Sequence, residues 1–225
     1  MQATSRDLSH WHPAPAPSPV TLRGRYVTLE PFHAHHADAV WRAVYAHNEL
    51  FRWLAHGPFS NEMVMMESLD HWRHVEHAIL LAIIPAEVGL AAGWASYMRA
   101  VPQHGVIEVG NVLFSPELQR TRAATESMYL MASHVFETLG YRRYEWKCDA
   151  ENHPSRDAAQ RLGFTFEGIF RQHMVVKGRN RDTAWFSMLD HEWPARKRAF
   201  ESWLHPENFD EEGFQRSSLQ QCFAV

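Results

Sequence analysis

The feature that most restricts the fold is a strand that runs through a tight turn into a long helix. Residues 106–114 form a mostly apolar run of strand length, which ends at Ser115-Pro116 because proline keeps the preceding residue extended. A helix is predicted over about 123–139, since its apolar side chains recur at helical spacing and Gly140 is a natural stop. The unpaired N–H groups and positive dipole end of its first turn suit a phosphate. An ordinary helix cap beside solvated arginines is the alternative explanation.

Around this unit, the pattern of apolar residues predicts a mixed sheet. Further strands are expected over 25–30, 79–84, 93–101, 142–148, 164–177 and 182–190. Further helices are expected over 37–46, 61–77, 154–162 and 192–204. Helices come early, strands fill the middle, and a strand–helix–strand–helix–strand unit comes late. We therefore expect an α/β fold (mixed α+β), in which helices flank both faces of a central sheet.

The chain is expected to form one domain with two extensions. No linker divides residues 22–204. Residues 1–21 form an N-terminal arm whose proline-rich run favours an extended segment, which either wraps the domain, stays mobile or binds a partner. Residues 205–225 form a polar C-terminal tail that is expected to be weakly ordered.

Composition excludes several classes of function. Hydrophobic residues make up 45% of the 225 residues and charged residues 21%, which is typical of a globular protein that buries its own core. The formal net charge of −4 gives no reason to expect a nucleic-acid partner. Two cysteines form no disulfide framework, which indicates a reducing compartment. We see no signal peptide and no apolar run near the ~20 residues that span a membrane, so we expect a cytoplasmic protein without membrane contact.

Two stretches of the chain, residues 119–124 before the predicted helix and residues 149–168 after a predicted strand, are similar to motifs of a known family. They resemble motifs of the GNAT superfamily of acyl-CoA-dependent N-acyltransferases. Gln119-Arg-Thr-Arg-Ala-Ala124 is similar to the Gln-x-x-Gly-x-Gly/Ala turn, whose backbone N–H groups hold the pyrophosphate of CoA. The stretch 149–168 resembles the Asn-x-x-Ser and Leu-Gly-Phe-x-x-Glu-Gly signature of the branch that acetylates ribosomal-protein N-termini (RimJ/RimL-like). The resemblance covers about residues 22–195. It implies a GNAT fold with a mixed, mostly antiparallel sheet of about seven strands, splayed between strands four and five.

The resemblance also implies a site for acetyl-CoA or another acyl-CoA. In this site the main chains of Val112, Leu113 and Phe114 pair with pantetheine and the thioester oxygen, and Asn152 contacts pantetheine. Arg122 stands where the family prefers glycine, the residue that allows the closest approach of backbone to phosphate. The phosphates are held by a turn and the start of a helix, which comprise Gln119, Arg120, Thr121, Arg122, Ala123, Ala124 and Thr125.

Acyl transfer to an amine needs an acid for the departing thiolate and a base for the amine. The resemblance assigns the acid to Ser155, although Asn152 and Ser155 are also typical helix-capping residues. Glu108 is the candidate base, because several family members carry a glutamate at this strand position and its apolar neighbours are expected to desolvate it. A surface glutamate with no role is the alternative. His173 and Glu167 are weaker candidates, and a mechanism with water alone as the base stays open.

The histidines form no recognised metal motif. The two groups with regular or close spacing are His71, His74 and His77, and His33, His35 and His36. Neither group has cysteine or carboxylate partners at a known metal spacing, so no metal is expected.

The sequence therefore predicts an N-acyltransferase that moves an acetyl or longer acyl group to a primary amine. The acceptor is a protein N-terminus, a lysine, a peptide or a small molecule, and the protein is expected to be a monomer or a homodimer. A GNAT-fold protein that binds acyl-CoA without turnover is the first alternative. A purely structural or interaction module is the second.

Overall fold

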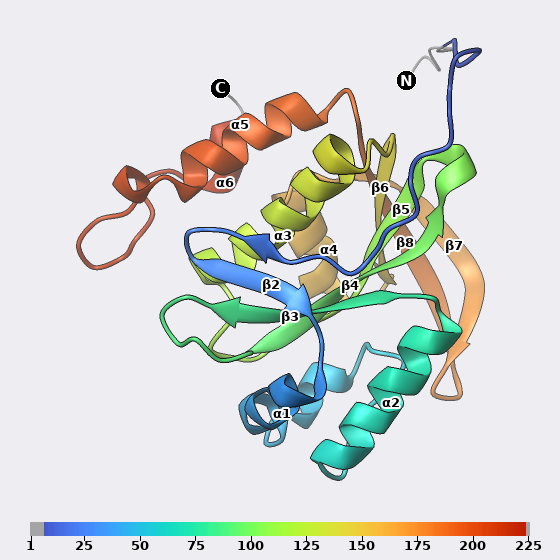
Figure 1. Cartoon of the computed structure of the whole chain (residues 1–225), viewed down its shortest axis with the longest axis vertical. Coiled ribbons are helices and arrows are strands. Elements are labelled where there is room, and N and C mark those ends of the chain that lie inside the picture. The colour runs from blue at the N-terminus through green and yellow to red at the C-terminus, as the bar shows by residue number, and fades with distance from the viewer. Residues whose placement is uncertain (1–6, 224–225) are drawn as a thin grey trace.

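The computed structural model describes residues 7–223, and an eight-stranded sheet forms its centre (Figure 1). The strands are β1 (Leu22–Arg23), β2 (Val27–Pro31), β3 (Ile79–Pro85), β4 (Gly93–Val101), β5 (Val106–Phe114), β6 (Arg143–Asp149), β7 (Thr165–Val176) and β8 (Arg179–Leu189). Their order across the sheet is β1-β2-β3-β4-β5-β6-β8-β7, and every neighbouring pair is antiparallel except β5 and β6. The expected mixed, mostly antiparallel sheet is confirmed. The strand beyond the expected seven is β1, whose two residues are too few to leave a hydrophobic pattern.

Helices cover both faces of the sheet, as predicted (Figure 1). They are α1 (Ala37–Val44), α2 (Glu62–Val75), α3 (Arg122–Ser133), α4 (His153–Arg161), α5 (Trp193–Leu204) and α6 (Leu219–Phe223). Short 3-10 helices span Ala34–His36, Asn48–Phe51, Pro102–His104 and Pro206–Asn208, and α3 continues as a π-helix over His134–Thr138. Between residues 7 and 223, no helix has both the length and the apolar character needed to cross a bilayer.

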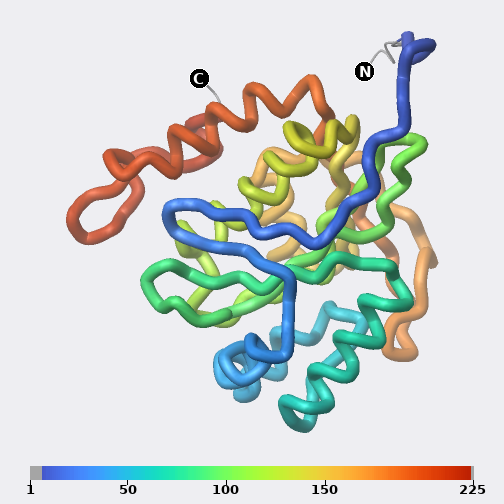
Figure 2. The backbone as a smooth tube through the Cα atoms, viewed as in Figure 1, coloured from blue at the N-terminus to red at the C-terminus, as the bar shows by residue number. Residues whose placement is uncertain are grey.

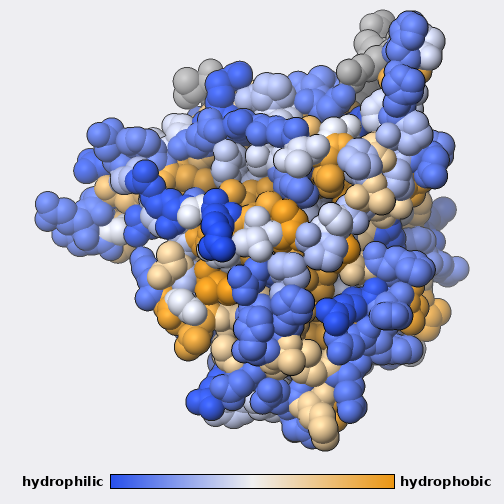
Figure 3. All heavy atoms as spheres, in the orientation of Figure 1, coloured by the Kyte–Doolittle hydropathy of each residue, from blue (hydrophilic) through white to orange (hydrophobic). Residues whose placement is uncertain are grey.

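Each face of the sheet has its own hydrophobic core, because successive strand residues point to opposite faces. Helices α1 and α2 cover one face and bury a cluster that includes Met65, Leu69 and Trp94. Helices α3, α4 and α5 cover the other face, where Ile107 and Val109 of β5 are buried. In the view of Figure 3, hydrophobic residues gather toward the middle of the molecule and the rim is mostly hydrophilic.

The two parallel strands β5 and β6 separate along their length. They pair only over 106–109 and 143–146, although β5 continues to Phe114 and β6 to Asp149. Within β5, three steps from Leu113 to Gly110 face only two steps from Trp94 to Ser96 in β4, which defines a β-bulge. Asn111 lies in this bulge with a left-handed φ of 50°. The expected splay between the fourth and fifth predicted strands is therefore present. The bulge bends β5 at the point where its pairing with β6 ends.

The proline-rich arm lies on the surface beside the turn between β4 and β5, as the tube in Figure 2 shows. The Ala14 N–H donates to Pro102 O at 3.1 Å, and the Trp11 indole N–H donates to Gln103 O at 2.9 Å. The Tyr141 hydroxyl donates to Pro15 O at 3.1 Å. These contacts support the interpretation that the arm wraps the domain. Its first six residues lie outside the described part of the chain.

The expectation of a weakly ordered C-terminal tail is wrong for residues 205–223. Phe209 and Gln215 form a β-bridge that closes a loop, and α6 packs on α5 with Leu219 only 1% exposed. The Trp203 indole N–H donates to Gln215 Oε1 at 2.8 Å. The apolar side chains of the tail that pack on the core are irregularly spaced in a polar stretch and produce no periodicity, so the sequence pattern does not reveal this docking; they are Phe209, Leu219, Cys222 and Phe223. Residues 224–225 of the tail lie outside the described range.

Candidate active site

A cleft of about 1840 Å³ follows the separation of β5 and β6. The end of β5 and the start of α3 line one side, and the end of β6 and the start of α4 line the other. The cleft reaches the loop after α1 at one end and the C-terminal tail at the other. Glu108, Ser155 and every residue predicted to bind the cofactor line it, whereas His173 and Glu167 do not. The structure thus brings the predicted site residues together around one space.

The turn into α3 presents unpaired N–H groups to this cleft. Thr121 is the N-cap of α3, and its Oγ1 accepts the Ala124 N–H at 3.1 Å while its own hydroxyl donates to Leu118 O at 2.7 Å. Within residues 7–223, the N–H groups of Arg120, Arg122 and Ala123 donate to no other group. Three free donors at the positive end of a helix form a site that suits a phosphate.

Arg122 does not disturb this turn, although it stands where glycine was expected. Arg122 is the first residue of α3 and has helical backbone geometry, and the left-handed φ of 63° belongs to Arg120 instead. The Arg122 guanidinium lies 4.9 Å from the ring centroid of Tyr26 and 4.7 Å from that of Phe209. Its side chain is therefore held between two aromatic rings, and its backbone N–H stays available.

A buried carboxylate fixes Tyr26 beside the same turn. The Glu126 side chain, on α3, accepts the backbone N–H groups of Arg25, Tyr26 and Val27 at 3.0, 2.6 and 3.0 Å. Glu126 is only 6% exposed, and a Cβ on the neighbouring Gly24 would lie 2.3 Å from Glu126 Oε2. No pattern in the sequence indicates this contact, because its two sides are about a hundred residues apart and one of them is main chain.

The main chain of β5 is open on the side that faces β6. Residues 110–114 pair with β4 on one edge and have no strand partner on the β6 edge among the described residues. The candidate positions Val112, Leu113 and Phe114 belong to this segment, and the Gln119 side-chain amide donates to Phe114 O at 3.1 Å. Asn111 is not among the predicted site residues, although Gly110-Asn111 inside a strand is typical of a bulge.

The Ser155 hydroxyl accepts one hydrogen bond and has a proton to donate, which the Cys148 sulfur accepts in this structure. The backbone N–H of Ser155 donates to Asn152 Oδ1 at 3.2 Å, which confirms the capping role of Asn152. Its Oγ accepts the Trp146 indole N–H at 3.0 Å, which leaves the hydroxyl proton for another acceptor. Burial raises the pKa of the neighbouring Cys148 thiol, and the hydrogen bond from Ser155 opposes that shift.

Glu108 is withdrawn from solvent as expected and is no surface glutamate, but its neighbours are charged and not apolar. It is 2% exposed, with Oε1 3.1 Å from Arg99 Nη1 and Oε2 2.9 Å from Lys147 Nζ. Lys147 also lies 2.7 Å from Glu145 Oε2 and 3.8 Å from the ring centroid of Trp185. Strand alternation explains the difference, because the apolar neighbours of Glu108 in β5 point to the opposite face.

The two weaker candidates for the base have partners away from the cleft. The His173 Nδ1 lies 2.9 Å from Thr183 Oγ1. The Glu167 carboxylate accepts from Arg143 and from the Ser187 hydroxyl, and the Arg143 guanidinium holds the pKa of Glu167 below its ordinary value. Neither residue lines the cleft, so the geometry favours Glu108 over both.

Three buried polar side chains near the bulge lack hydrogen-bond partners within residues 7–223. They are His56, with both ring nitrogens unpaired, Asn111 at its amide nitrogen, and Trp94 at its indole nitrogen. The His56 ring packs against Trp72 and Trp94. Burial lowers the pKa of His56 to about 4, and the Lys177 ammonium acts in the same direction while the Asn111 carboxamide opposes it. His56 is therefore neutral at physiological pH.

The buried His56 makes folding sensitive to mild acid. Because its folded pKa is lower than its unfolded pKa, the unfolded chain binds the proton first, and stability falls as the pH drops from about 6.5 towards 4. We expect His56→Gln to reduce the loss of unfolding free energy between pH 7 and pH 5 by about 2 kcal/mol. Urea unfolding at both pH values measures this. His71→Gln, on the exposed side of α2, is the matched control, and equal losses in both variants would contradict the prediction.

One group of side chains resembles a metal site more closely than the sequence indicates. Glu30, His35 and His36 place potential ligand atoms within 4.8 Å of one another, so the histidines do have a carboxylate neighbour. However, His36 Nδ1 accepts the His33 backbone N–H at 3.0 Å, which puts the ring proton on Nε2, 2.8 Å from Glu30 Oε1. A nitrogen that carries a proton has no lone pair for a metal, so these contacts favour a hydrogen-bonded pair.

Residues 27–165 match the family described as Acetyltransferase (GNAT) domain, and the chain belongs to this family. It is 48% identical to a GCN5-related N-acetyltransferase from Brucella melitensis, with a TM-score of 0.93 over 97% of this chain and 100% of that chain. It is 40% identical to a probable acetyltransferase (GNAT family) from Chromobacterium violaceum, with a TM-score of 0.80 over 86% of this chain and 98% of that chain.

RimJ of Mycobacterium smegmatis, solved in complex with CoA-disulfide, shares the fold. Its identity to this chain is 20%, and its TM-score is 0.67 over 78% of this chain and 90% of that chain. GNAT domains generally use acetyl-CoA as a co-substrate and an amine as the acceptor. The family therefore supports N-acetyltransferase activity for this chain.

Proposed function

We propose that the protein transfers an acetyl or longer acyl group from acyl-CoA directly to a primary amine of a protein, a peptide or a small molecule. The observation that carries this proposal is the set of groups that line one cleft. The cleft collects three free N–H groups at the start of α3, the open edge of β5 and the Ser155 hydroxyl. These groups suit the pyrophosphate, the thioester oxygen and the departing thiolate of one extended donor.

In the proposed reaction, the amine nitrogen attacks the thioester carbonyl carbon, a C–N bond forms and the C–S bond breaks. Free N–H groups on β5 stabilise the negative charge that develops on the carbonyl oxygen. The amine loses its proton through water to Glu108, and the thiolate takes a proton from the Ser155 hydroxyl, which solvent then restores. Asn152 fixes the start of α4 and so positions Ser155.

Calorimetry with acetyl-CoA, and with desulfo-CoA as a control, tests the donor site first. A panel of peptide N-termini, lysine and small amines then tests turnover by the release of free thiol. Binding without thiol release for any amine or acyl length would favour a non-catalytic acyl-CoA-binding protein. The two ion pairs that Glu108 forms with Arg99 and Lys147 support that alternative, because they engage the carboxylate that would serve as the base. Failure to bind any acyl-CoA would contradict both functions.

Replacement of Ser155 tests the acid. We expect Ser155→Ala to lower kcat by about 100-fold, as for the loss of a general acid, and to leave the Kd of CoA unchanged. Steady-state thiol release and calorimetry measure the two quantities. Ser133→Ala, on the outer side of α3, is the control and is expected to keep the wild-type rate. A wild-type kcat for Ser155→Ala would remove this residue from the mechanism.

Replacement of Glu108 tests the base. We expect Glu108→Gln to lower kcat/KM by about 10–100-fold, because the carboxylate no longer accepts the amine proton, and a pH profile of kcat/KM measures the loss. The matched control is Glu145→Gln, which disturbs the same Lys147 ammonium but does not line the cleft. A similar profile for both variants would assign Glu108 to structure and not to proton transfer.

A further inference from the structure

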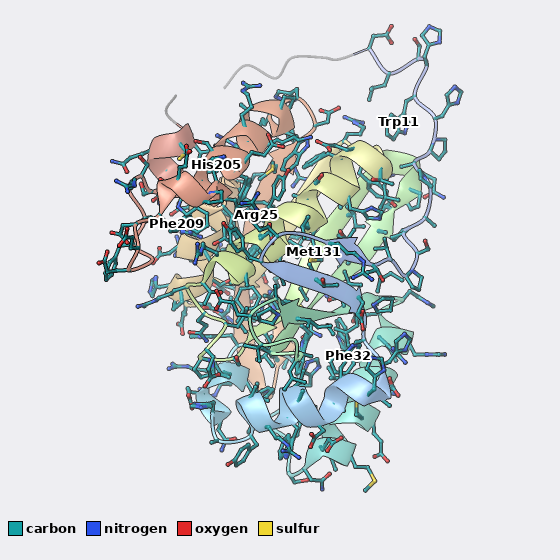
Figure 4. The ribbon with its side chains drawn as sticks, turned by 60° about the vertical axis from the view of Figure 1, so that its left-hand side comes forward. Trp11, Arg25, Phe32, Met131, His205 and Phe209 are labelled. Carbon is teal, nitrogen blue, oxygen red and sulfur yellow. The ribbon has the colours of Figure 1, made fainter. Side chains whose placement is uncertain are left out.

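The cleft continues past the phosphate-binding turn into a wall that the C-terminal tail builds. This wall lies outside residues 27–165, which match the family. Figure 4 shows Phe209 of the tail and Arg25 of the β1–β2 turn on the same side of the molecule, and both line the cleft. The tail side of the wall is formed by Trp203, Phe209, Gly213, Phe214, Gln215 and Gln220.

Contacts on both sides of the wall hold the tail in place. The Phe209 ring packs on the Arg122 guanidinium and lies edge-on to Trp203, with ring centroids 5.2 Å apart. The Tyr26 hydroxyl donates to Leu204 O at 3.1 Å, and the Asn208 amide donates to Trp203 O at 3.0 Å. The tail is thus connected to the same Tyr26 and Arg122 that flank the phosphate-binding turn.

The arginines at this end of the cleft form no ion pair among the described residues, although Glu117 and Asp157 also line the cleft. Arg25, Arg120, Arg122 and Arg161 all line it, and none has a carboxylate within 4.0 Å among residues 7–223. The nearby Glu126 is satisfied by backbone N–H groups. Arg161 is partly buried and donates only to the Thr125 hydroxyl, at 3.2 Å. Guanidinium groups without carboxylates in a cleft are suited to an anion, and in particular to a phosphate.

An exposed aromatic ring lies at the tip of the tail loop. The Phe214 side chain is 71% exposed, although it lines the cleft, and its backbone N–H donates to Asp210 Oδ1 at 2.7 Å. A flat apolar ring whose backbone is held in place provides a surface on which a purine stacks. Phe214 and the arginines together therefore combine a stacking surface with an anion site.

We infer that the tail is part of the donor site and holds the nucleotide end of acyl-CoA, the 3′-phosphorylated adenosine. Arg25 and Arg161 bind the 3′-phosphate, and Phe214 stacks on the adenine. This inference rests on the proposed function. It makes the protein selective for full-length CoA thioesters over donors that lack the 3′-phosphate or the nucleotide.

Calorimetry with CoA and with 3′-dephospho-CoA tests the inference. We expect the wild-type protein to bind CoA at least about 10-fold more tightly than 3′-dephospho-CoA, since the phosphate meets two guanidinium groups. Arg25→Gln is expected to reduce this ratio to about 3-fold or less. Phe214→Ala is expected to weaken both ligands by about 5–10-fold and to keep their ratio. Arg171→Gln and Phe170→Ala, on exposed β7 positions outside the cleft, are the matched controls and are expected to bind as the wild type does.

Failure of this inference can be distinguished from failure of the proposed function. If the wild type binds CoA but the ratio to 3′-dephospho-CoA is near one, or if Arg25→Gln keeps the wild-type ratio, the arginines do not bind the 3′-phosphate. If Phe214→Ala binds both ligands as the controls do, the tail has no part in donor recognition. The proposed function then survives. If the wild type binds neither ligand, the proposed function itself fails. Far-UV circular dichroism of each variant ensures that a loss of binding is not a loss of folding.

Discussion

Thr121→Asp is expected to weaken CoA binding by about 100-fold and to cost only about 1 kcal/mol of stability, since a carboxylate cannot donate to Leu118 O as the threonine hydroxyl does. Aspartate is as good an N-cap as threonine, so its carboxylate still accepts the Ala124 N–H and α3 still starts at the same residue. The same carboxylate puts a negative charge among the free N–H groups that are proposed to hold the pyrophosphate. Repulsion between charges about 5 Å apart in a partly buried site amounts to about 3 kcal/mol, which corresponds to about 100-fold in Kd.

The control for this experiment is Thr121→Asn. Asparagine keeps the N-cap and has the size of aspartate, but it carries no charge. We expect Thr121→Asn to bind CoA within about 3-fold of the wild type, because asparagine is an equally good N-cap. Calorimetry gives both affinities, and thermal unfolding shows whether α3 is intact. If Thr121→Asp binds CoA as Thr121→Asn does, the phosphates do not bind at the start of α3.

Glu126→Gln is expected to lower the free energy of unfolding by about 3 kcal/mol. The Glu126 carboxylate accepts three backbone N–H groups in a nearly closed site, and hydrogen bonds to a charged acceptor are the strong ones. A carboxamide keeps one oxygen but turns an NH₂ group towards donors, which leaves at least one buried N–H unpaired. Urea unfolding at pH 7 measures the difference.

Glu201→Gln, on the exposed side of α5, is the control for the loss of a charge. Glu201 accepts one hydrogen bond, from the Tyr129 hydroxyl at 3.1 Å, so its replacement is expected to cost less than about 1 kcal/mol. Similar losses in the two variants would show that the backbone contacts of Glu126 contribute little. A larger loss for Glu126→Gln alone would identify this residue as the attachment of the β1–β2 turn to α3.

The sequence predicts most of the fold because its elements have strong local patterns. Strands β4 and β5 have the predicted bounds, and the other predicted strands and helices lie within a few residues of theirs, since apolar runs and the stops at Pro116, Gly140 and Gly163 are visible in the chain. The tail was missed for the opposite reason. Its order comes from single side chains that dock on distant elements, and such contacts leave no periodic pattern.

The sequence predicts which backbone segments form the candidate site, but it does not predict the charged neighbours of Glu108. The start of α3 and the start of α4 could be placed from capping residues and turn signals, and the structure puts both on one cleft. The surroundings of Glu108 could not be placed, because Arg99 and Lys147 belong to neighbouring strands whose register the sequence does not specify. The same limit hid His56, which reaches the bulge from a loop far away in the chain.

The short pairing between β5 and β6 also has a mechanical consequence. Among residues 7–223, the ladder between β5 and β6 has four residue pairs, so strands β1 to β5 and strands β6 to β8 are two parts of one sheet that a narrow seam joins. A donor that contacts the end of β5 and the start of α4 would connect the two parts of the sheet at the end where β5 and β6 are not paired. Binding of the donor would then make the whole sheet stiffer. By the same linkage, a substitution that changes the pairing of β5 and β6 would also change the affinity for the donor.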